Sequence, residues 1–83
     1  MVKPTRVTNS IRTLRFAHGE MTQQALADRA GVARQTIIAL EAGHYAPSLL
    51  LAFRLATIFG VPIEEVFQYD PQPQPLTLST PAQ

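Results

Sequence analysis

Residues 22–41 constrain the fold of this chain more than any other part of its sequence. They contain two short segments in which apolar residues recur at the spacing of an α-helix, separated by only a few residues. Gly31 stands between the segments, where a left-handed backbone conformation ends a helix readily. Because so short a turn cannot hold two helices antiparallel over their full length, they must cross at a steep angle. This is helix-turn-helix geometry, and it presents the second helix outward.

The two helices of this unit have distinct inward and outward faces. The first turns Leu26, Ala27 and Ala30 inward, and its two alanines are small enough for close packing. Successive residues lie about 100° apart around a helix, which places Ile37 and Leu40 on the inward side of the second. The opposite side consists of Arg34, Gln35, Ile38 and Ala42, with Ala39 at its margin.

Arg34 and Gln35 are the candidate base-reading residues, because they project from the first turn of the outward helix. Arginine bonds through two nitrogens to guanine O6 and N7, and glutamine bonds in the same way to adenine N6 and N7. Ile38 and Ala39 complete the candidate base-contacting surface. The alternative is an ordinary solvated helix face, on which Arg and Gln are common.

Further segments surround this unit in a definite order. Before the unit come Ile11, Leu14, Arg15 and Gly19. The unit itself contains TQQALA at 22–27, GVARQTI at 31–37 and LEAG at 40–43. After it come YAPSL at 45–49, LA at 55–56 and FGVPIEEVF at 59–67. Over roughly residues 9–67 the chain therefore resembles the phage lambda repressor and Cro family of helix-turn-helix regulators. The resemblance implies an all-α fold, a compact five-helix bundle that binds double-stranded DNA. Ala33 differs from the family pattern, in which Ser or Thr usually caps the recognition helix at this position. Loss of that side-chain cap costs about 1 kcal/mol of stability.

Apolar periodicity and cap residues predict five helices. The expected starts are Asn9 or Ser10, Thr22, Ala33, Ser48 and Pro62, and the expected stops include Gly43 and Gly60. The first helix should turn Ile11, Leu14 and His18 inward. Residues 1–8 are then an N-terminal arm, 9–67 the DNA-binding domain, and 68–83 a tail rich in Pro and Gln that is flexible or extended. LTLS at 76–79 alternates as a strand does, although a disordered tail is the favoured interpretation.

Arg15 and Glu41 are two charges that need partners. On the helical wheels each lies at the border of an inward face, so both are expected to be semi-buried. In the family an Arg of the first helix pairs with the Glu that ends the recognition helix, and these positions match. The resemblance thus implies a structural ion pair, and the alternative is two independent solvated charges.

Phosphate contacts are expected where helices begin. Free amides at the starts of the second and fourth helices suit an anion, which points to Thr22, Gln23 and Ser48. By resemblance, Gln23 also braces Gln35, and the loop residues His44 and Tyr45 approach the DNA backbone. Tyr45 as a cap on the core is an equally open alternative.

Charge is distributed unevenly along the chain. Its net charge is only +1, but residues 1–34 carry +4 and the remainder −3. Such a chain can turn its basic half toward phosphate and its acidic half away.

Leu50 and Phe53 lie on the far side of the fourth helix from its inward stripe of Leu51, Ala52, Leu55, Ala56 and Phe59. Two large apolar side chains exposed together suggest self-association, and a twofold dimer would make the operator roughly palindromic. The leading hypothesis is therefore a sequence-specific DNA-binding regulator that acts as a homodimeric repressor. The alternative is a protein-interaction module, such as the antitoxin of a toxin pair, that binds a protein through its tail or this apolar face.

Other classes of function find little support. The chain has no cysteine, no catalytic or metal-ligand motif and no phosphate-cradling glycine loop, so neither an enzyme nor a cofactor or metal site is expected. No signal peptide is evident, and the longest apolar run, residues 49–53, falls far short of the roughly 20 residues that span a bilayer. A soluble cytoplasmic protein without membrane contact is expected.

Overall fold

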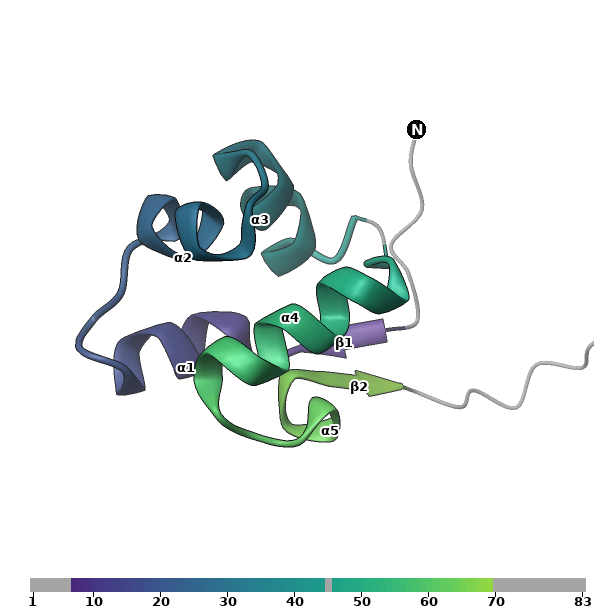
Figure 1. Ribbon diagram of the computed structural model, residues 1–83. Helices are drawn as coiled ribbons and strands as arrows, with labels where there is room; N and C mark the ends of the chain where they lie inside the picture. Colours follow the sequence, from purple (N-terminus) through teal and green to yellow (C-terminus); the bar gives the residue numbers. More distant parts are fainter. Residues whose placement is uncertain (1–6, 45, 70–83) are drawn as a thin grey trace, which may run out of the picture.

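The computed structural model describes residues 7–44 and 46–69. Five helices and two strands follow one another as β1 (Val7–Asn9), α1 (Ile11–Ala17), α2 (Gln23–Ala30), α3 (Arg34–Glu41), α4 (Leu49–Phe59), α5 (Ile63–Val66) and β2 (Phe67–Tyr69). In Figure 1, α2 and α3 lie together at the top, while α5 and the strands lie below α4. The helix-turn-helix formed by α2 and α3 thus stands at one side of the bundle.

Side-chain caps and glycine stops define α2 and α4. The hydroxyl oxygens of Thr22 and Ser48 each accept a hydrogen bond from the amide three residues later, at 2.9 and 3.1 Å. Gly31 and Gly60 end these helices with φ values of 75° and 69°, a conformation that costs glycine little. The predicted starts and ends of both helices are confirmed.

The chain on either side of the helices forms a sheet that the all-α expectation missed. β1 and β2 pair antiparallel, with Val7 opposite Tyr69 and Asn9 opposite Phe67. The expected limits of the domain, residues 9 and 67, fall inside this sheet. Two three-residue strands so far apart in the chain carry no turn signal between them, so their pairing leaves no pattern in the sequence. The strand suggested by LTLS lies outside the described residues.

The inward faces predicted for the helices form the core. Its buried residues include Ile11, Leu26, Ala27, Ala30, Ile37, Leu40, Leu51, Leu55, Ala56, Phe59 and Val66. Side chains from all five helices therefore pack in one apolar core, which fixes the orientation of α3 relative to α1 and α4.

His18 departs from its predicted place on the inward stripe of α1. The helix ends at Ala17, and His18 is exposed with non-helical backbone angles. Its Nδ1 lies 2.8 Å from the carbonyl oxygen of Leu14, and its Nε2 lies 2.9 Å from that of Phe59. The ring also packs edge-on against Phe59. The His18 ring thus bridges the end of α1 and the end of α4, with a ring nitrogen within hydrogen-bonding distance of a backbone carbonyl on each.

Candidate nucleic-acid interface

Helix α3 presents its first turn to solvent. Arg34 and Gln35 are exposed, whereas Ile38 and Ala39 are partly buried. The opposite side of the helix lies in the core. The accessible surface of α3 is therefore centred on the two residues at its N-terminal end, the end that reaches base edges when a recognition helix enters a major groove.

Helix α3 begins at Ala33 without a side-chain cap. The backbone of Ala33 (φ −73°, ψ 152°) resembles that of Thr22 (φ −78°, ψ 163°) and Ser48 (φ −63°, ψ 158°), both of which do cap their helices. The conformation suits a cap, but alanine has no oxygen to accept an amide hydrogen bond. The expected loss of this cap is confirmed.

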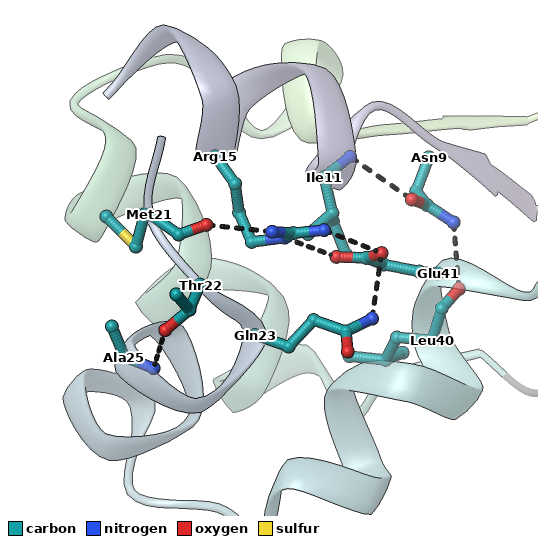
Figure 2. A network of polar contacts seen from close by, with 9 residues as sticks. All are labelled: Asn9, Ile11, Arg15, Met21, Thr22, Gln23, Ala25, Leu40 and Glu41. Atoms are coloured by element: carbon teal, nitrogen blue, oxygen red, sulfur yellow. Dashed lines mark hydrogen bonds and ion pairs between the residues drawn. The ribbon is translucent and has the colours of Figure 1, made fainter. Parts of the chain in front are cut away.

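An ion pair between α1 and α3 holds the end of α3. Arg15 Nε donates to Glu41 Oε2 at 2.6 Å, and Arg15 Nη2 donates to Oε1 at 3.2 Å (Figure 2). The two side chains are 8% and 12% exposed. Arg15 Nη1 also donates to the carbonyl of Met21 at 2.7 Å. The structure thus brings the predicted partners together, and one guanidinium links α1, the segment before α2 and the last residue of α3.

Gln23, the first residue of α2, joins the same network. Its Nε2 donates to Glu41 Oε1 at 3.3 Å (Figure 2). The resemblance implies a brace between Gln23 and Gln35, but within the described part of the chain Gln23 contacts Glu41 instead. The Glu41 carboxylate thus accepts hydrogen bonds from both Arg15 and Gln23.

Asn9 supports α3 from the other side, a role that the sequence did not reveal. Its Nδ2 donates to the carbonyl of Leu40 at 2.8 Å, and its Oδ1 accepts from the amide of Ile11 at 3.1 Å (Figure 2). The Leu40 carbonyl also accepts from the Gly43 amide at 3.0 Å, so Asn9 adds a second hydrogen bond at the end of α3. Of the two cap residues expected for α1, it is Asn9 that supplies the side-chain acceptor.

The predicted phosphate contacts lie around the starts of α2 and α4. Thr22, Ser48 and the loop residue His44 are exposed, and Gln23 is partly exposed. The hydroxyl oxygens of Thr22 and Ser48 accept cap hydrogen bonds, yet each O–H group remains able to donate to an anion. Tyr45 falls outside the described residues.

A depression of about 460 Å³ lies beside this network, between α1, α2 and α3. Arg12, Phe16 and Arg34 line it, together with Thr22 and Gln23 from the start of α2. Arg12 and Phe16 were not predicted as site residues. The only sequence signal for Arg12 is the basic bias of the first 34 residues.

Leu50 and Phe53 form a separate apolar patch on α4. They are 62% and 52% exposed, as the helical wheel predicts. Arg29 and Arg54 line a second depression together with Leu50 and Phe53, and they give the patch a cationic rim. Arg54 Nη1 donates to the carbonyl of Ala30 at 3.1 Å, which ties α4 to the end of α2.

Comparison with known proteins agrees with this geometry. The Helix-turn-helix family model matches residues 11–66, from the start of α1 to the end of α5. The chain belongs to the lambda repressor and Cro family of helix-turn-helix proteins. This is a family of DNA-binding transcriptional regulators and not of enzymes.

Relatives of this helix-turn-helix protein come from distant organisms. It is 52% identical over 62 residues to an uncharacterized HTH-type transcriptional regulator of Methanocaldococcus jannaschii, covering 75% of this chain and 92% of that protein. It is 42% identical over 59 residues to the HTH-type transcriptional regulator YgzD of Bacillus subtilis, covering 71% of this chain and 88% of that protein. Among solved structures, the restriction-modification controller protein C.AhdI of Aeromonas hydrophila superposes with a TM-score of 0.60 at 33% identity, covering 66% of this chain and 82% of that chain.

Residues 7–44 and 46–69 contain neither a membrane-spanning helix nor a metal-binding cluster. None of the helices there is long and apolar enough to cross a membrane. Nor does this part of the chain group three or more His, Cys, Asp or Glu side chains where they would hold a metal ion.

Proposed function

We propose that this protein is a sequence-specific transcriptional regulator whose helix α3 reads the major groove of DNA. The observation that carries the proposal is the exposure of Arg34 and Gln35 at the start of a helix whose end is held by Arg15 and Glu41. The Arg34 guanidinium can form two hydrogen bonds to O6 and N7 of guanine, and the Gln35 amide can form two to N6 and N7 of adenine. Ile38 and Ala39, farther along α3, offer apolar contact to thymine methyl groups.

Contacts to phosphate position α3 in the groove. The first-turn amides of α2 and α4 lack acceptors within their helices and carry partial positive charge, which favours an anion near Thr22, Gln23 and Ser48. His44 and Tyr45 contact the strand from the loop after α3. Such contacts set the register of the domain on DNA but carry no sequence information.

The protein binds as a homodimer and acts as a repressor by occupying its operator. A single helix-turn-helix makes few base contacts, and a net charge of +1 gives little electrostatic help, so useful affinity requires two half-sites bound at once. Leu50 and Phe53 are the candidate interface because they are large, apolar and exposed side by side. A twofold dimer places its two α3 helices about 34 Å apart and makes the operator roughly palindromic.

Selection of bound sequences from a random DNA pool tests this function. The enriched sequences should contain two inverted half-sites with centres about 10 base pairs apart, and the pure protein should bind them more tightly than a shuffled duplex of equal length. Equal affinity for both duplexes would contradict sequence-specific readout. Enrichment of a single, unrepeated half-site would keep the readout and contradict the dimer.

A protein-interaction module, such as an antitoxin, is the second candidate function. The rim formed by Arg29 and Arg54 favours it, because a twofold contact through this patch brings like charges near one another, whereas an acidic partner complements them. Sedimentation and co-purification separate the two. A monomer at high micromolar concentration that retains one acidic protein through the patch supports the interaction module, and a dimer without such a partner contradicts it.

A further inference from the structure

We propose that Arg12 and Phe16 of α1 form a phosphate-binding site that extends the DNA interface beyond the helix-turn-helix. This inference rests on the proposed function, since the phosphate belongs to the DNA backbone. Arg12 binds the anion, and Phe16 is the platform that positions Arg12.

The Arg12 guanidinium is held without being neutralised. Its central carbon lies 5.4 Å from the centroid of the Phe16 ring, which is within the range of a cation–π contact. Within residues 7–44 and 46–69, Arg12 forms no ion pair. Arg12 is exposed, and so is Phe16 one helical turn later. The stacked side chain is therefore restricted in motion but keeps its N–H groups free for a ligand.

The balance of charge in the depression favours an anion. Glu41 is the only acidic residue that lines it in the described part of the chain, and Arg15 already pairs with both of its oxygens. Among the described residues, Arg12 and Arg34 form no ion pair, and they remain as cations from two different helices. Their planar guanidinium groups match the paired oxygens of a phosphodiester.

The place of the depression identifies the phosphate as one of the DNA backbone. Its wall includes Thr22 and Gln23 at the start of α2 and Arg34 on the first turn of α3. A strand that passes the start of α2 while α3 occupies the groove therefore passes Arg12 as well. Arg29 is also exposed, but it lines the depression around Leu50 and Phe53 on α4 and not this one.

Phe16 also connects the site to the element that reads bases. The guanidinium carbon of Arg15 lies 5.4 Å from the Phe16 centroid, so the ring contacts both Arg12 and Arg15. Arg15 in turn pairs with Glu41, the last residue of α3. A phosphate bound at Arg12 thus lies against the same set of side chains that sets the angle of α3.

The test compares Arg12→Gln with Glu65→Gln, which changes one exposed charge on α5 that lines neither depression. Binding to the selected operator and to a random duplex is measured as a function of salt. Arg12→Gln should weaken both complexes by the same factor and reduce the slope of log K against log[salt] by about 0.9, the value for one phosphate. Glu65→Gln should leave the slope nearly unchanged. Equal slopes for the two variants would overturn the site.

Phe16→Leu tests the platform, because leucine keeps the apolar cover but has no π face. Phe16→Leu should weaken both DNA complexes less than Arg12→Gln does. The double variant should bind DNA no more weakly than Arg12→Gln alone. Additive losses would show that Phe16 acts independently of Arg12 and would overturn its positioning role. If the unmodified protein binds no duplex at any salt concentration, the proposed function fails. If it binds and Arg12→Gln behaves like Glu65→Gln, only this inference fails.

Discussion

Arg15 and Glu41 lie on different helices and share two hydrogen bonds, of 2.6 and 3.2 Å, in a setting where both side chains are almost fully buried. Removing one partner leaves the other as an uncompensated charge, which is far more costly than losing a surface pair. Arg15→Met should therefore lower the free energy of unfolding by about 3 kcal/mol, and Glu41→Met should have a comparable effect. Urea unfolding monitored by circular dichroism measures both.

Glu65→Gln is the control for this pair, because Glu65 is exposed on α5 and should change stability by less than about 0.5 kcal/mol. The Arg15→Met, Glu41→Met double variant should lose much less than the sum of the single losses. Additive losses in this cycle would mean that the pair is not coupled.

Asn9→Ala should destabilise the protein by about 1 kcal/mol. The change removes the donor to the Leu40 carbonyl and the acceptor for the Ile11 amide. Thr8→Ala is the control, since the 3.5 Å contact of the Thr8 hydroxyl is long and exposed. Thermal unfolding of the two variants is compared, and equal melting temperatures would argue against a supporting role for Asn9.

Ala33→Ser should stabilise the protein by about 1 kcal/mol. Ala33 is exposed and has the backbone conformation of a capping residue, so a serine there gains an acceptor without losing packing. Ser48→Ala makes the reverse change at the start of α4 and should cost a similar amount. If Ser48→Ala destabilises while Ala33→Ser changes nothing, the uncapped start of α3 is not a weakness of this fold.

Arg34→Ala and Gln35→Ala should each weaken operator binding by about 1–3 kcal/mol and relax the choice of base at one position. Both side chains are exposed, so stability should change little. Binding to the operator, to single-base variants of it and to random DNA is measured by fluorescence anisotropy. Glu65→Ala, at an exposed position on α5, controls for a change of one exposed charge. Equal losses on operator and random DNA would rule out direct readout by either residue.

Replacing Leu50 and Phe53 together by Glu should leave a helical protein, because neither side chain belongs to the core. The double variant should become monomeric and bind the operator more weakly. Leu49→Glu is the control for assembly, since Leu49 is more exposed than either residue, at 69%, but does not line the depression around Leu50. Sedimentation measures the assembly. A double variant that remains dimeric would place the interface elsewhere, and a monomeric unmodified protein would exclude the dimer.

Local signals account for what was predictable in this fold. Thr22 and Ser48 mark helix starts, Gly31 and Gly60 mark helix ends, and apolar periodicity identifies the buried faces between them. Each of these signals acts within one or two helical turns, so it survives in the sequence whatever the rest of the chain does. His18 was misplaced because periodicity alone does not register that a helix has already ended at Ala17.

The sequence by itself determined the five helices, the outward position of Arg34 and Gln35, and the exposure of Leu50 and Phe53. Only the tertiary structure decided how distant residues meet. The pairing of β1 with β2, the bond from Asn9 to Leu40, the contact of Gln23 with Glu41 and the shared depression of Arg12 and Arg34 all join parts of the chain that are far apart in sequence. These contacts depend on the angles at which the helices pack, and those angles follow from the shape of the whole core rather than from any local pattern.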